Sequence, residues 1–280
     1  MNKLIGLKNI KYEIHHLKEP LCHIIFYGPR GSGKTALSEY IAESKNKKLI
    51  FLTGNTLKLN ELMNVFVNVE EGDVILIDEI HRLSPRVEEL LYQPMEKFKI
   101  SIKNTSGTIQ MYPLPKFTLI GTTTKPSMLS KPLMSRFQVA FQIPHYNLRE
   151  LAQIVRLKQS VSRSSALKIA LNIITPREAI NLASRVMSLV KDNSEKEVSK
   201  SLEFIGYKYG LSKSERFYLK IVYNVGKIGL SNLSSALQLD EDEVRYIEEK
   251  LIRKGYIQVS SRGRCLSVKG LIKIKEMKRQ

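Results

Sequence analysis

The chain has 280 residues, of which 42% are hydrophobic, so it can form more than one packed core rather than remain disordered. Its formal net charge of +18 favours a polyanionic partner such as nucleic acid, although a lysine-rich source genome is an alternative explanation. The two cysteines exclude a disulfide framework and a cysteine-ligated zinc site, and no apolar stretch has the length of a signal peptide or a membrane span. We therefore expect a cytoplasmic protein with two or three domains.

The first half of the chain alternates apolar runs with helical patterns, as in βαβ units. The predicted strands are 23–27, 48–53, 73–77, 117–122 and 139–143. This order predicts an α/β domain, a doubly wound parallel sheet, over residues 1–147. After the third strand, two short alternating runs flank a turn-rich segment, which predicts a projecting β-hairpin over 99–112.

The run Gly28-Pro-Arg-Gly-Ser-Gly-Lys-Thr35 follows the first predicted strand and precedes a helical pattern. It matches the phosphate-binding loop G-x-x-x-x-G-K-[ST], in which glycines at 28, 31 and 33 let successive backbone N–H groups point at phosphate oxygens. Lys34 is expected to reach the β- and γ-phosphates, and the Thr35 hydroxyl to bind Mg²⁺. The pattern predicts a nucleoside triphosphate, such as ATP, and Mg²⁺ as cofactors.

The predicted strand 73–77 ends in two adjacent carboxylates, Asp78 and Glu79. Open α/β sheets bind their ligands at the carboxyl ends of their strands. We expect Asp78 to hold the magnesium shell and Glu79 to polarise the attacking water. Together with the phosphate loop, these carboxylates predict hydrolysis of the bound triphosphate.

Residues 148–208 have a wholly helical pattern, which predicts a small helical domain. The last part, 209–280, is predicted to contain three helices followed by two strands, which is typical of a winged helix. These elements are 212–225, 230–237, a helix beginning at Asp240, and strands 256–259 and 265–268 joined by a turn over 260–264.

The third helix of a winged-helix domain normally enters the major groove of DNA. Here that helix begins Asp240-Glu-Asp-Glu243, which would repel phosphate, whereas residues 255–280 carry seven basic residues against one acid. We therefore assign duplex binding to the wing, through Arg262 and Arg264, with mostly sequence-independent, salt-sensitive contacts. A winged helix that only packs against a protein partner is the alternative.

Further sequence motifs are spread along nearly the whole chain. They are Asp78–Pro85, Val87–Tyr92 with Met95–Glu96, Phe117–Thr124, Ser127–Phe137, Thr175–Arg177 and Ser261–Arg264. Together they closely resemble the RuvB family of AAA+ motors. The resemblance implies an AAA+ large domain, a helical lid and a winged helix. It also implies a homo-oligomeric, hexameric ring that uses ATP to move double-stranded DNA at Holliday junctions, with RuvA, in recombination and repair.

The resemblance also assigns individual residues. Thr123 or Thr124 would lie at the sensor position near the γ-phosphate. Arg136 would be the arginine finger that reaches the ATP of the neighbouring subunit, where a guanidinium can stabilise the charge that develops on the phosphoryl oxygens. In the wing, Arg264 would bind DNA, and the hairpin 99–112 would dock a RuvA-like partner. The implied nucleotide contacts are Gly28, Gly31, Gly33, Lys34, Thr35, Ala36, Glu96, Tyr146 and Arg177.

In that family a Leu-Arg-Pro element precedes the segment that begins here at Ile5-Gly6, so we expect a divergent member shortened at its N-terminus. Two other functions stay open at this point. One is a DNA-binding ring subunit of the same class that hydrolyses ATP slowly. The other is a clamp-loader or replication-initiation ATPase, which shares the phosphate loop and the finger but accounts for neither the Asp78–Pro85 block nor the basic wing.

Overall fold

The computed structural model describes residues 4–18, 21–103, 108–190, 192 and 194–278, and the chain divides into two compact units, Met1–Tyr146 and Asn147–Gln280. The first unit contains a five-stranded parallel sheet in the order β2-β3-β6-β1-β7. Its strands are β1 (Ile24–Tyr27), β2 (Leu49–Thr53), β3 (Val74–Asp78), β6 (Thr118–Thr123) and β7 (Val139–Gln142). These are the five strands that the sequence predicts, and the α/β fold is confirmed.

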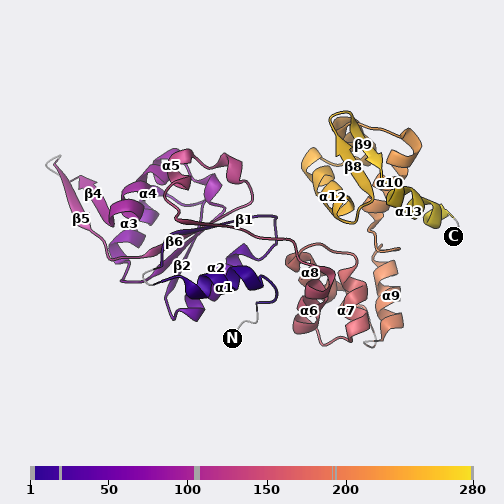
Figure 1. Cartoon of the computed structure of the whole chain (residues 1–280), viewed down its shortest axis with the longest axis horizontal. Helices are drawn as coiled ribbons and strands as arrows, with labels where there is room; N and C mark the ends of the chain where they lie inside the picture. Colours follow the sequence, from indigo (N-terminus) through magenta and orange to yellow (C-terminus); the bar gives the residue numbers. More distant parts are fainter. Residues whose placement is uncertain (1–3, 19–20, 104–107, 191, 193, 279–280) are drawn as a thin grey trace. The chain divides into compact units, whose positions relative to one another are not determined.

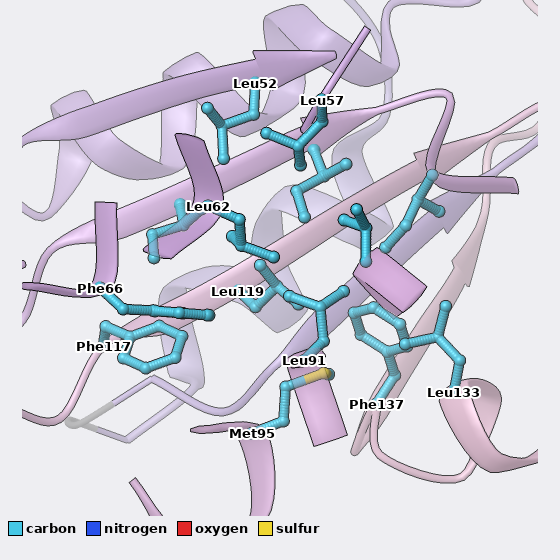
Figure 2. Close-up of a cluster of buried hydrophobic side chains, with 14 of the residues drawn as sticks. Leu52, Leu57, Leu62, Phe66, Leu91, Met95, Phe117, Leu119, Leu133 and Phe137 are labelled. Atoms are coloured by element: carbon cyan, nitrogen blue, oxygen red, sulfur yellow. The ribbon is translucent and has the colours of Figure 1, made fainter. Parts of the chain in front are cut away.

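Helices cover both faces of this sheet because successive strand residues point to opposite sides. Val74 and Leu76 pack with α1 (Lys8–His16) and α2 (Lys34–Ser44), whereas Ile75 and Ile77 face the other helices. Figure 2 shows the cluster on that second face, where Leu62, Phe66, Leu91 and Met95 pack against Leu119. The elements there are α3 (Leu59–Asn68), α4 (Pro85–Lys97), α5 (Lys131–Met134) and the short turn η1 (Ile80–Arg82). A second short turn, η2 (Pro126–Met128), lies between β6 and α5 in the chain.

The predicted β-hairpin is present. Strands β4 (Lys99–Lys103) and β5 (Ile109–Pro113) pair antiparallel and project from the first unit (Figure 1). Residues 104–107 of the predicted turn lie outside the described residues.

The second unit begins with four helices, as the sequence predicts for residues 148–208. Their N-termini carry side-chain caps: Asn147 forms a capping box with Glu150, and Thr175 accepts the Glu178 N–H. The helices are α6 (Leu148–Lys158), α7 (Arg163–Ala170), α8 (Pro176–Met187) and α9 (Glu195–Phe204).

The winged-helix fold of the remaining residues is also confirmed. Ser212 forms a capping box with Glu215 at its first helix, and Asp240 caps its third. A core that includes Leu219, Leu233 and Leu251 joins the helices to the wing. The elements are α10 (Lys213–Val225), α11 (Leu230–Leu237), α12 (Glu241–Arg253), β8 (Ile257–Ser260), β9 (Gly263–Leu266) and α13 (Val268–Lys278).

Two details of the predicted wing are wrong. The turn over 260–264 is shorter than expected, because Ser260 pairs with Gly263 and Arg264 therefore lies in β9. The predicted strand 265–268 ends early, because the Ser267 hydroxyl accepts the Gly270 N–H and begins α13, a helix that the alternating pattern concealed. Gly270 permits this packing, since a Cβ there would lie 2.0 Å from the Tyr256 carbonyl oxygen.

In the described part of the chain, no helix is both long enough and apolar enough to span a membrane.

Candidate nucleotide site and nucleic-acid interface

The loop between β1 and α2 has the conformation that a phosphate-binding loop requires. Gly31 and Gly33 have φ values of 73° and 91°, in the left-handed region where a side chain is unfavourable. Gly33 directly precedes α2, so the positive end of that helix faces the loop. The Lys34 side chain is buried and its Nζ donates to the carbonyl oxygens of Gly28 and Pro29, each at 3.0 Å. The loop therefore curls around the Lys34 ammonium group.

Sheet order brings the predicted catalytic groups to one edge. Strand β6 lies between β1 and β3, and its register pairs Thr123 with Tyr27 and Gly121 with Ile77. The phosphate loop follows β1 and the two carboxylates lie at the end of β3, so the threonines of β6 lie between them. The carboxyl edge therefore collects the loop, Asp78, Glu79 and both predicted sensor threonines.

Both carboxylates are held by hydroxyls from the end of β6. Thr122 donates to Asp78 Oδ1, and Thr124 donates to Glu79 Oε2 at 3.1 Å. Glu79 itself has a φ of 51°, an uncommon conformation for a residue with a side chain. Strain of this kind is typical of functional sites, where surrounding contacts hold a side chain in place.

His81 lies beside the same carboxylate. Its Nδ1 is 3.2 Å from Glu79 Oε2 and 2.9 Å from the Thr123 hydroxyl oxygen. Burial lowers the pKa of the imidazole, and the attraction of Glu79 only partly opposes this, so the ring is neutral at pH 7. The ring therefore fixes the positions of Glu79 and Thr123.

Sequence reasoning missed two residues at this edge. The sequence motifs assign no role to Thr122, although strand alternation places it on the same side as Thr124. Gly54 follows β2, and a Cβ there would lie 2.5 Å from the Glu79 carbonyl oxygen. Gly54 therefore has to lack a side chain for β2 to approach the Asp78–Glu79 backbone. An isolated glycine after a strand carries no signal of that contact in the sequence.

The residues of this edge fit a magnesium–triphosphate group. The loop offers curled backbone amides and a helix N-terminus, and the half-buried Thr35 hydroxyl and Asp78 are the hard oxygen ligands that Mg²⁺ prefers. In addition, the Ser32 hydroxyl is buried in the loop and makes no hydrogen bond to any described residue. A buried polar group normally has a partner, so Ser32 is suited to an oxygen-rich ligand.

The other predicted nucleotide contacts lie in different places. Tyr146 covers the loop, since a Cβ on Gly33 would lie 3.4 Å from the Tyr146 hydroxyl oxygen. Ala36 is exposed in the first turn of α2. Arg177 is exposed in the first turn of α8, in the second unit. Glu96 lies on α4, where it contacts Arg136.

Arg136, the predicted finger, follows α5 and is held by its own chain. Its guanidinium lies 4.2 Å from the centre of the Tyr92 ring and pairs with Glu96 at 3.0 Å. Its Nε donates to the Tyr92 carbonyl oxygen at 3.4 Å. Cation–π and ion-pair contacts together fix this side chain beside α4.

The two arginines of the wing have different environments. Arg262 is exposed at the turn between β8 and β9, and the stem of the exposed Lys227 lies against Gly263 beside it. Arg264 instead faces the domain interior: its Nε donates to Glu248 Oε1 at 2.6 Å, and its side chain is 12% exposed. The hydrogen bond to Glu248 raises the pKa of the Arg264 guanidinium further. Arg262 at the turn and Lys227 beside Gly263 are thus the exposed basic residues at this end of the wing.

Comparison with known proteins gives the same family for the first unit and for the winged-helix domain. Residues 8–143 match the family model described as "Holliday junction DNA helicase RuvB P-loop domain", and residues 208–275 match "RuvB C-terminal winged helix domain". The chain is 38% identical to the Holliday junction branch migration complex subunit RuvB of Campylobacter fetus, over 90% of this chain and 78% of that one. It is 40% identical to the same subunit of Aliarcobacter butzleri, over 90% and 79%. Among solved structures, the Thermotoga maritima RuvB Holliday junction branch migration motor superposes with a TM-score of 0.79 at 30% identity, covering 97% of this chain and 95% of that one.

Proposed function

The chain belongs to the RuvB family, and from that premise we propose that it is an ATP-driven motor subunit of Holliday junction branch migration. In this proposal it forms a hexameric ring on double-stranded DNA and acts with a RuvA-like partner in recombination and repair. It is an ATP hydrolase coupled to translocation along DNA, and it works in the cytoplasm. The observation that carries the proposal is the convergence of the phosphate loop, Asp78, Glu79 and Thr124 at one sheet edge.

Each residue of that edge then has a defined task. Lys34 and the N-terminus of α2 bind the phosphates, while Thr35 and Asp78 hold Mg²⁺. The metal, when bound, would neutralise charge on the phosphate oxygens. Glu79 orients the attacking water, and Thr124 and His81 keep the Glu79 carboxylate in place. Thr123 fixes His81 and so completes the sensor position.

Arg136 is proposed to act on the nucleotide of the neighbouring subunit. Its contacts with Tyr92 and Glu96 support this assignment, because they place the guanidinium with α4 and α5 rather than at its own phosphate loop. Glu96 then belongs to the same intersubunit contact as Arg136. Hydrolysis would therefore require ring assembly.

Two surfaces are proposed to contact partners. Arg262 and Lys227 at the tip of the wing would contact phosphates of duplex DNA, which gives sequence-independent, salt-sensitive binding. The hairpin β4–β5 would dock the RuvA-like partner, and it exposes apolar side chains suited to a protein interface: Ile109, Met111 and Tyr112 are 67%, 45% and 37% exposed. We also propose three functional domains, 1–147, 148–208 and 209–280.

The direct test is ATP turnover by the purified full chain, alone, with a four-way DNA junction, and with the junction and RuvA. We expect the junction and RuvA to stimulate turnover and to produce branch migration. Glu79→Gln should bind ATP but hydrolyse it at least about 10²-fold more slowly, because the water loses its orienting carboxylate. A wild-type protein that binds ATP and duplex yet never hydrolyses faster than Glu79→Gln would contradict the motor and leave the slow ring subunit as the better description.

A further inference from the structure

Helix α12 connects two parts of the second unit through charged contacts on opposite sides of its axis. On one side, Glu248 accepts hydrogen bonds from Arg264 in β9 and from the Tyr218 hydroxyl, the latter at 3.0 Å. On the other side, Lys250 and Arg253 reach the helical lid. At 100° per residue, Lys250 and Arg253 lie roughly 140–200° around the helix from Glu248. One rigid helix therefore contacts both the wing and the lid.

The lid contacts converge on a single turn, residues 174–178, at the start of α8. Lys250 Nζ lies 2.8 Å from Glu178 Oε1, and Arg253 Nη1 donates to the Ile174 carbonyl oxygen at 3.1 Å. The Tyr246 hydroxyl, also on α12, hydrogen-bonds to the Glu178 carboxylate. Three side chains of α12 thus hold the turn that carries Arg177.

Glu178 transmits this contact to the backbone of the turn. Its second oxygen, Oε2, accepts the Ile174 N–H at 2.9 Å, and its own N–H donates to the Thr175 hydroxyl at 3.3 Å. Arg177 is the neighbouring residue and is exposed. Because Glu178 fixes the backbone on both sides of Arg177, a shift of α12 has to move the Arg177 main chain.

The ion pair between Lys250 of α12 and Glu178 of the lid is costly to break. The Lys250 and Glu178 side chains are only 7% and 20% exposed. Burial lowers the pKa of Lys250, but the carboxylates of Glu215 and Glu178 outweigh it and raise the pKa, so the ammonium stays charged. Separating such a pair leaves a buried charge without its partner, which is strongly unfavourable. The lid turn and α12 should therefore move together.

We propose that α12 couples the DNA-contacting wing to the nucleotide-contacting turn, and that Lys250 and Glu178 are positioning residues for Arg177. Duplex bound at the wing then biases the placement of Arg177, and bound nucleotide biases the wing. The proposal rests on the proposed function, since it takes Arg177 as a nucleotide contact and the wing as the DNA contact. It also gives two of the acidic residues of this helix a structural role, since Glu248 and Glu249 hold Arg264 and Arg253.

The test measures how strongly each ligand tightens the binding of the other. Duplex affinity is measured with and without a non-hydrolysable ATP analogue, and analogue affinity with and without duplex, on the full chain. All variants are compared at a protein concentration where sedimentation shows the same assembly. Thermodynamic linkage requires the two tightening factors to be equal. We expect Lys250→Met to reduce both tightening factors about fivefold or more, towards unity.

Three further variants test whether this result comes from the ion pair. Arg245→Met removes a positive charge from the exposed side of the same helix and should keep the wild-type factor. Lys250→Arg keeps the charge and should restore most of the coupling, which a purely structural role tied to volume would not predict. Glu178→Gln retains an oxygen for the Ile174 N–H but removes the ion pair, so it carries the test if Lys250→Met fails to fold.

The outcomes separate the two proposals. A wild type without any linkage between duplex and analogue would overturn the coupling, whereas the motor is overturned separately by the absence of ATP turnover with the junction and RuvA. A wild type with linkage and a folded Lys250→Met or Glu178→Gln variant that keeps the full factor would overturn the coupling alone. Equal losses in Arg245→Met would also overturn it, because the effect would then follow net charge rather than the α12–α8 contact.

Discussion

The Arg264 guanidinium lies 2.6 Å from Glu248 Oε1, inside the winged-helix domain rather than at the exposed turn of the wing. The Glu248 side chain is 6% exposed and also accepts a hydrogen bond from the Tyr218 hydroxyl. Burial and the neighbouring Glu248 carboxylate raise the pKa of Tyr218, which keeps it a hydrogen-bond donor. Arg264 is thus held in the interior of the domain, whereas Arg262 is exposed at the turn.

Arg264→Ala should therefore act on stability. The substitution leaves the Glu248 carboxylate buried without its cation, at a cost of about 3–5 kcal/mol. Urea unfolding followed by circular dichroism measures the loss, and Arg264→Ala with Glu248→Gln should recover part of it. A stability change below about 0.5 kcal/mol for Arg264→Ala would mean that the pair is dispensable.

Arg262→Ala should act on DNA binding and leave the unfolding transition unchanged, because the side chain is exposed. Loss of one phosphate contact reduces the dependence of log affinity on log salt by about 1 unit. The measurement is fluorescence anisotropy of duplex DNA across a salt series. Arg245→Ala, an exposed arginine on acidic α12, is the matched control. An unchanged slope for both Arg262→Ala and Lys227→Ala would place the DNA contact elsewhere.

Arg136→Ala should bind ATP normally but hydrolyse it about 10³-fold more slowly or worse, because no guanidinium reaches the neighbouring phosphoryl group. Mixing it with Lys34→Ala protein should restore part of the turnover, since a Lys34→Ala subunit still offers its own Arg136. Arg86→Ala is the control variant, because Arg86 is an exposed arginine on α4. Absence of rescue in mixed rings would show that Arg136 does not act between subunits.

His23 should make the first unit sensitive to acid. The ring is buried, contacts the Met95 carbonyl oxygen through Nε2 at 3.0 Å, and accepts the Leu119 N–H through Nδ1 at 2.8 Å. Burial lowers its pKa to about 4, although the Met95 contact opposes the shift. The unfolded chain therefore binds a proton at a pH where the folded chain does not, and stability falls as the pH drops below 6.5, levelling off near 4.

Between pH 8 and pH 5 this single group should cost about 2 kcal/mol of stability. Urea midpoints at the two pH values measure the loss. His23→Gln should show a smaller difference between them, whereas His15→Gln, an exposed histidine, should behave as the wild type. The same pH difference in His23→Gln and wild type would remove His23 as the cause.

The sequence by itself determined the five strands, the phosphate loop, the two carboxylates and the helical character of residues 148–208. These features depend on local patterns: an apolar run forms a buried strand, and glycines permit a curled loop. Only the tertiary structure decided which side chains meet. Thr122 and Asp78 are 44 residues apart, and Arg264 and Glu248 are 16 apart, so their pairing depends on strand order and helix packing that no local pattern encodes. For the same reason Arg262 and Arg264 look alike in the sequence, yet Arg262 lies in the exposed turn before β9, whereas Arg264 lies within β9 and pairs with the buried Glu248.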